Sequence, residues 1–103
     1  MTLLSVRHAR KAFGGWAGRT AYNRAQILYR VAEIMEDRRP QFTDAVVLAE
    51  GVTATQAGRI VDAAIDRLVW YAGWADKITQ VTGNANPVAG PYFNFTVPEP
   101  MGV

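Results

Sequence analysis

Two separate apolar stripes run along one long stretch of helix-forming residues that begins near Thr53 or Thr55 and continues to about Val81. Successive residues of an α-helix are about 100° apart, so each residue can be assigned to a face. One broad face collects Val61, Ala64, Ile65, Leu68, Ala72 and Ala75. A narrow stripe on nearly the opposite side collects Ala63, Arg67, Trp70 and Trp74. A surface helix needs only one apolar stripe. This helix must therefore be sandwiched inside the fold or meet a partner along its second side.

Three further helices are predicted before this one. Residues 5–13 are compatible with a helix that Gly14 and Gly15 would stop. Thr20 is a suitable N-cap for a helix over residues 21–37. Pro40 suits the first turn of a short third helix, which Gly51 would end. The predicted inward face of the 21–37 helix consists of Ala25, Leu28, Val31, Ala32 and Met35.

A single strand is predicted at the C-terminal end. The turn formers "TGNANPVAGP" come after the last helix, and "YFNFTV" then alternates. Phe93, Phe95 and Val97 fall on one face of this strand, with Tyr92 opposite. The prediction is a mainly α, single partial domain: helices over 1–81, a loop over 82–91, the strand at 92–97 and a tail at 98–103. One strand is not stable alone, so it needs a partner strand, and no second strand is evident.

Composition narrows the functional classes. A net charge of +2 with no long basic run argues against nucleic acid or an anionic membrane as a partner. No apolar run is long enough to span a bilayer, and the N-terminus does not resemble a signal peptide. A cytoplasmic location is therefore expected. Because the chain contains no cysteine, it has neither a disulfide framework nor a thiolate for catalysis or metal binding.

With these elements placed, the chain resembles the N-terminal part of the NAD(P)-dependent aldehyde dehydrogenase superfamily. The stretches that carry the resemblance are "ARKAFGGWAGRTAYNRAQILYRVAEIMEDRR", "YAGWADKI" and "GPYFNFTVPEPMGV". In that family the Glu-Pro-x-Gly-Val segment leads into the cofactor-binding domain, with the general-base glutamate and the nucleophilic cysteine further downstream. The resemblance implies an NAD(P) enzyme when complete, but a chain without catalytic, cofactor-binding or metal residues of its own. "AFGGWAG" has no preceding strand, so it is not a dinucleotide-binding turn.

The resemblance also suggests roles for particular residues. The position of Ala63 would face the aldehyde tunnel as a small wall residue. The segment around Tyr92–Val97 would pair with a neighbouring subunit or with the remainder of the enzyme. The residues expected at interfaces are Arg67, Trp70, Trp74, Tyr92, Phe93, Phe95 and Val97.

Other charged residues are better explained by ordinary solvation. His8 lies between basic residues, with no carboxylate or nucleophile at a helical spacing to orient it. Asp62 and Asp66 are one helical turn apart, but two carboxylates without a third ligand bind hard metals poorly. Glu50 precedes Gly51, near a position where family members sometimes bind a cation, but Val52 replaces the common lysine and the site is not carried over.

Three functional hypotheses remain. In the first, the chain is a truncated aldehyde-dehydrogenase-like segment, inert alone, that supplies scaffold and an association strand. In the second, it is an independent helical interaction module that uses the stripe of Trp70 and Trp74. The third, an active oxidoreductase, requires a nucleophile that the 103 residues lack.

Overall fold

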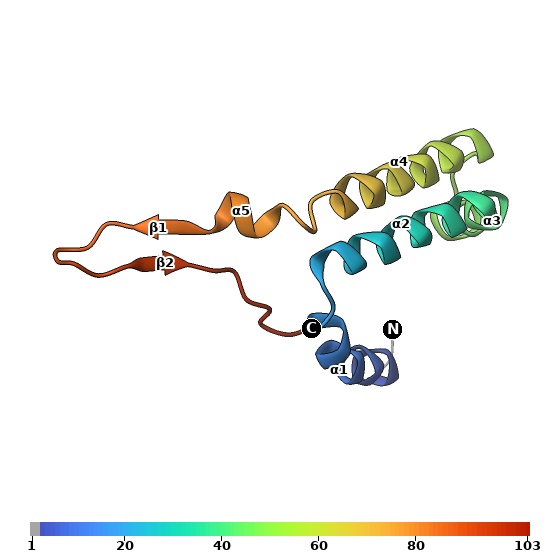
Figure 1. The fold of residues 1–103 in the computed structure, drawn as a ribbon. Helices are drawn as coiled ribbons and strands as arrows, with labels where there is room; N and C mark the ends of the chain where they lie inside the picture. The colour runs from blue at the N-terminus through green and yellow to red at the C-terminus, as the bar shows by residue number, and fades with distance from the viewer. Residues whose placement is uncertain (1–2) are drawn as a thin grey trace.

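The computed structural model describes residues 3–103 and is mostly helical (Figure 1). The elements in chain order are α1 (Leu3–Ala17), α2 (Ala21–Asp37), α3 (Arg39–Glu50), α4 (Ala54–Ala72), α5 (Ile78–Thr82), β1 (Asn84–Asn86) and β2 (Asn94–Thr96). The prediction of a mainly α chain that ends in β structure is confirmed, with five helices where three to four were expected.

The core lies between α2, α3 and α4, which together form the helical body. Figure 1 shows α2 and α4 side by side, with α3 packed at their far end. Ala32, Val61 and Ile65 are buried at the centre, and Met35, Val46 and Leu68 pack around them. Most of the other buried residues are alanines: Ala25, Ala57 and Ala72. Small residues let the helix backbones approach closely. Of the predicted inward positions, only Val31 is substantially exposed.

The predicted caps of the helical body are confirmed. The Thr20 hydroxyl accepts a hydrogen bond from the backbone N–H of Asn23 at 3.1 Å, which starts α2. Thr53 and Gln56 form a reciprocal capping box at the start of α4. Gly51 ends α3 with a φ of 66°, a left-handed conformation that glycine adopts without steric cost. Local hydrogen bonding therefore defines where these helices begin and end.

The first helix is longer than the sequence predicts. It runs through Gly14 and Gly15 to Ala17, where a stop at Gly14 was expected. Two glycines inside a helix cost about 1 kcal/mol each relative to alanine. The helix end has compensating contacts, because the guanidinium of Arg24 donates to the carbonyls of Ala17 at 3.4 Å and Arg19 at 2.5 Å. These bonds satisfy acceptors at the terminus of α1.

The long helix is shorter than predicted, since α4 ends at Ala72 instead of near Val81. Residues 73–77 continue as a series of hydrogen-bonded turns, and a separate short helix, α5, follows. Glycine has low helix propensity, so Gly73 is a natural end point. The ammonium group of Lys77 donates to the Gly73 carbonyl at 2.5 Å and supplies the partner that a further helical turn would have provided.

The predicted strand has a partner within the chain, which corrects the expectation of a loop over 82–91 and of a lone strand. β1 pairs antiparallel with β2, with Ala85 opposite Phe95. The strand β2 covers residues 94–96, shorter than the predicted 92–97. The sequence did not predict β1, because asparagine has a low strand propensity. The Asn86 amide compensates by donating to Asn94 at 2.8 Å and to the Thr96 hydroxyl at 3.0 Å across the pair.

The molecule is elongated, because α5, β1 and β2 form an arm (residues 78–96) that extends away from the helical body (Figure 1). Its extents are 63 × 29 × 23 Å and its radius of gyration is 18.9 Å, against about 13 Å for a compact domain of this length. Its accessible area is 8491 Å², whereas a compact monomer of this mass exposes about 5,700 Å². Within residues 3–103, no helix is long and apolar enough to cross a membrane.

Candidate functional site

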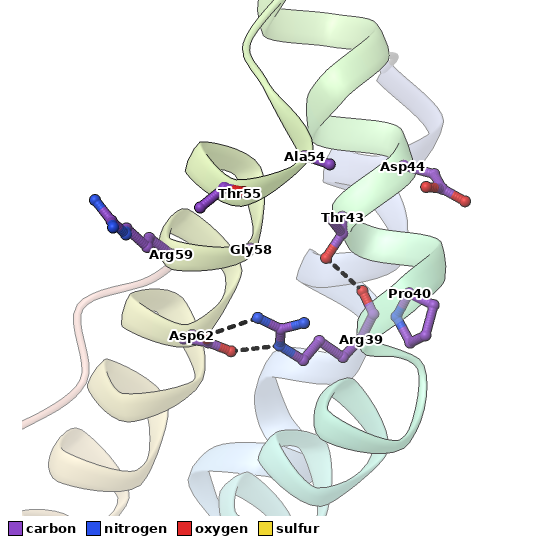
Figure 2. A pocket seen from close by; sticks show the side chains of 9 residues that line it. All are labelled: Arg39, Pro40, Thr43, Asp44, Ala54, Thr55, Gly58, Arg59 and Asp62. Atoms are coloured by element: carbon purple, nitrogen blue, oxygen red, sulfur yellow. Dashed lines mark hydrogen bonds and ion pairs between the residues drawn. The ribbon is translucent and has the colours of Figure 1, made fainter.

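An ion pair braces the start of α3 against the middle of α4, at the edge of a surface hollow of about 540 Å³ (Figure 2). The Arg39 guanidinium donates from Nε to one Asp62 carboxylate oxygen at 2.6 Å and from Nη2 to the other at 2.8 Å. This two-bond geometry is the strongest arrangement available to an arginine and a carboxylate. The Thr43 hydroxyl donates to the Arg39 carbonyl at 2.8 Å, so the first turn of α3 is also held from within.

Gly58 makes room for this ion pair. A Cβ at position 58 would lie 2.8 Å from Nη2 of Arg39, closer than real Cβ atoms approach a heavy atom. Hydrogen bonding from Arg39 lowers the pKa of the Asp62 carboxyl below its ordinary value, although partial desolvation opposes the shift. The same hydrogen bond raises the pKa of Arg39. Both groups therefore stay charged at neutral pH.

The charged residues that line this hollow have a structural role. Two cations and two carboxylates line it, Arg39 and Arg59 with Asp44 and Asp62, so their charges balance. Asp62, which could have shared a cation with Asp66, is instead bound to Arg39. Among residues 3–103 no three potential ligands group closely enough to hold a metal ion. We therefore assign this hollow to the packing of α3 on α4.

An aromatic cluster forms the exposed side of the α4 C-terminus. The rings of Trp70 and Trp74 have centroids 5.5 Å apart, although Trp74 lies in the turn after α4 and not on the helix. Tyr71, which the sequence analysis missed, meets Trp70 edge to face at 4.9 Å. Trp70 is 58% exposed and Tyr71 is 64% exposed. The sequence signal for Tyr71 was its place next to Trp70 in a segment rich in aromatic residues.

Only some of the predicted site residues on α4 come together. Arg67 and Trp70 line a shallow hollow of about 380 Å³ with Asp66 and Tyr71. Ala63 lies half-buried one turn earlier and does not line this hollow. The suggested role of Ala63 in a tunnel wall therefore stays a prediction. The narrow second stripe of α4 therefore presents an exposed aromatic surface at Trp70, flanked by the negative charge of Asp66 and the positive charge of Arg67.

The arm presents an apolar face. Phe93 and Phe95 project on the same side of the chain, with ring centroids 5.3 Å apart and exposed fractions of 80% and 59%. Tyr92 and Val97, expected on the strand, flank β2 and are also exposed. The polar side chains of Asn86, Asn94 and Thr96 bond to each other across the strand pair. The β structure thus has one satisfied polar face and one open apolar face.

A second apolar surface, which sequence reasoning missed, lies where α1 meets the C-terminal tail. A groove of about 550 Å³ is bounded by Phe13 and Trp16 of α1, Ile78 of α5, and Pro98 and Pro100 of the tail. Figure 1 shows the C-terminus beside the end of α1, which brings the C-terminal tail next to the first helix. The apolar spacing of α1 was visible in the sequence, but its packing against residues almost 90 positions later was not.

Comparison with known proteins places this arrangement in one family. The model of the aldehyde dehydrogenase family matches residues 4–103. Retinal dehydrogenase 2 of Gallus gallus is 39% identical over 103 residues, covering 96% of this chain and 19% of that protein. Aldehyde dehydrogenase, cytosolic 1, of Elephantulus edwardii is 37% identical, covering 96% of this chain and 20% of that protein. The chain therefore spans about a fifth of the length of the curated relatives it matches.

A solved structure shares both fold and sequence. The crystal structure of a NAD-dependent benzaldehyde dehydrogenase from Corynebacterium glutamicum superposes with a TM-score of 0.73 and 25% identity, covering 84% of this chain and 18% of that one. The matches correspond to an N-terminal segment of the superfamily, as the sequence motifs indicated. The chain belongs to the aldehyde dehydrogenase family.

Proposed function

We propose that this chain is the helical and association segment of an NAD(P)-dependent aldehyde oxidoreductase and that it does not oxidise aldehydes by itself. The observation that carries the proposal is the family match over residues 4–103 in a chain that spans about a fifth of its relatives. Aldehyde oxidation through a covalent intermediate needs a nucleophile and a hydride acceptor. None of the 103 residues is a cysteine, so a thiolate has to come from other residues.

The structure supports the association role through its exposed surface. The arm leaves the helical body with Phe93 and Phe95 uncovered, and a two-stranded sheet has two free edges. Backbone pairing at such an edge, with aromatic side chains filling pockets, is a general mode of association. The partner in this proposal is a second copy of the chain or the remainder of the enzyme. NAD(P) would be bound by that remainder.

Two measurements test the proposal on the purified chain. Formation of NAD(P)H from a panel of aldehydes should stay at the background rate, and turnover above it would contradict the inert role. Light scattering should show a dimer or larger species at micromolar concentrations. Phe93→Ser with Phe95→Ser should shift that species toward monomer.

The matched control removes an exposed apolar side chain elsewhere. Leu48, near the end of α3, is 88% exposed and lies on the helical body. Leu48→Ser should therefore leave the mass unchanged. A wild-type chain that stays monomeric throughout, or equal masses for all three proteins, would rule out association through the arm.

The exposed aromatic cluster favours a second candidate function, an independent helical interaction module. Trp70 and Tyr71 expose more than half of their area, and large aromatic side chains are common anchors in protein interfaces. If the cluster serves only a partner, Trp70→Ala with Trp74→Ala should hardly change the urea midpoint. A large loss of stability would assign the cluster to the fold of this chain instead.

A further inference from the structure

Three segments of the arm, α5, β1 and β2, come together at Gly83. Gly83 follows the last residue of α5 and precedes the first residue of β1. Its backbone N–H donates to the Thr79 carbonyl at 2.8 Å, which closes the last turn of α5. Thr96, at the end of β2, pairs with Asn84 immediately after the glycine. The end of one helix and the ends of two strands are therefore packed around position 83.

There is no room for a side chain at this point. A Cβ on Gly83 would lie 3.1 Å from the Thr96 carbonyl oxygen and closer still to the Thr79 carbonyl oxygen. Both obstacles are backbone atoms, which cannot swing aside as the end of a flexible side chain can. The φ and ψ of Gly83, −82° and 132°, are open to any residue, so the requirement is for space and not for glycine's conformational freedom.

The other end of α5 is held as well. The backbone N–H groups of residues 73–75, 77 and 78 donate hydrogen bonds to the carbonyls of Val69, Tyr71, Ala72 and Trp74. A Cβ on Gly73 would lie 3.3 Å from the Tyr29 hydroxyl of α2, so the turn after α4 sits against the helical body. The route from the body to the strand pair is a chain of close contacts and turn hydrogen bonds. The strand pair is therefore joined to the helical body by hydrogen-bonded turns and a short helix instead of by an open loop.

We propose that Gly83 is a positioning residue for association, because it lets β2 close against the end of α5 and so fixes the direction of the strand pair. This inference rests on the proposed association role, and it adds that the association surface is preformed. A preformed surface avoids the entropy of ordering a loop on binding. A methyl group at position 83 has to separate β2 from α5, break the Asn84–Thr96 pairing, or both.

The test uses the full 103-residue chain with Gly83→Ala, and Gly14→Ala as the matched control. An added Cβ at Gly14 meets nothing within 4 Å, and Gly14 lies in a helix, so alanine is harmless there. The primary measurement is the nuclear Overhauser contact between Ala85 and Phe95 across the strand pair. It should be present in the wild type and in Gly14→Ala, and lost or strongly weakened in Gly83→Ala.

Association is the second readout and separates the two proposals. If Gly83→Ala loses the Ala85–Phe95 contact and its dimer dissociates at least tenfold more readily, both proposals are supported. If the wild type is monomeric but Gly83→Ala still loses the contact, only the association role fails. If Gly83→Ala keeps the contact, the positioning role is overturned, as it is if the wild type lacks the contact. Loss of the helical body in Gly83→Ala would also overturn it, since position 83 lies outside that body.

Discussion

A missing side chain on α4 leaves room for the ion pair that joins α3 to α4. Gly58 lies buried on α4 where the Arg39 guanidinium crosses, and a methyl group there would lie 2.8 Å from Nη2, so the guanidinium would have to shift. The ion pair itself is half exposed, and exposed pairs contribute little to stability because water screens them. Its main contribution is geometric, because the two parallel hydrogen bonds fix the start of α3 relative to one turn of α4.

The pH dependence of this pair follows from the direction of the Asp62 shift. Its pKa is lowered in the folded state, so its contribution is present above the unfolded pKa of about 4 and is lost as pH falls through the folded value. Asp62→Asn should therefore lower the urea midpoint at pH 6–7, and the gap to wild type should narrow below about pH 4 and close as pH falls through the lower pKa of the folded state. Below that folded pKa the protonated carboxyl resembles the amide. Asp66→Asn is the control and should show no such convergence, whereas parallel curves for Asp62→Asn would contradict the assignment.

Sequence reasoning at this scale found residues that act within their own segment. Thr20 and Gly51 were identifiable because a cap bonds to the backbone within four residues. Arg39 and Asp62 are 23 residues apart, and nothing local distinguishes Asp62 from Asp66. The pairing depends on how α3 lies across α4. Local sequence patterns do not predict this arrangement.

At the scale of elements, the helical body depends on a narrow apolar seam between α2 and α4. Ala32 of α2 packs against Val61 and Ile65 of α4, and Met35 and Leu68 close the sides. The amphipathic pattern predicted this face well, because the spacing of apolar residues alone determines which side of a helix is apolar. Element ends were less predictable, as α1 and α4 show. Arg24 and Lys77, which follow these helices in the chain, donate to carbonyls at or just past the helix ends.

Removing side-chain volume from this seam should be costly. Ile65→Ala leaves a cavity at the centre of the body, and such changes cost about 2–5 kcal/mol. Ile60→Ala, on the same helix but 48% exposed, should cost under about 1 kcal/mol. Urea denaturation followed by the helical circular dichroism signal measures both. Similar losses for the two variants would show that the seam is not the core.

The strand pair shows the limit of propensity arguments. β1 consists of Asn, Ala and Asn, residues that are poor strand formers, and Pro87 follows it. The strand exists because the amide of Asn86 bonds to two side chains of β2 and because Gly83 admits the Thr96 carbonyl. Both causes lie in the contacts between segments, which is why the sequence predicted one strand and a loop.

At the scale of the whole molecule, the chain has more surface than a domain of its size needs. Its accessible area exceeds that of a compact monomer by an amount on the order of 2,700 Å². An excess of that size matches the area that permanent protein interfaces bury. The groove between α1 and the tail, the aromatic cluster and the arm account for distinct parts of it.

Solution scattering should detect this shape. At concentrations where light scattering gives the monomer mass, small-angle X-ray scattering should give a radius of gyration near 18.9 Å. A compact chain of this length would give about 13 Å. The double variant Phe93→Ser with Phe95→Ser provides the monomer if the wild type associates. A value close to 13 Å would mean that the arm folds back onto the helical body.

The contacts of the helical body are local in sequence, which affects when the chain folds during its synthesis. Its three helices contact one another within residues 21–72, and the arm adds no substantial contacts to them. Such local contacts form quickly, on a timescale shorter than the addition of a few residues by a ribosome. Once residue 72 has left the exit tunnel, α2, α3 and α4 can close around Ala32, Val61 and Ile65 while the strands are still inside it. The body would then already be closed when the apolar face of the arm emerges.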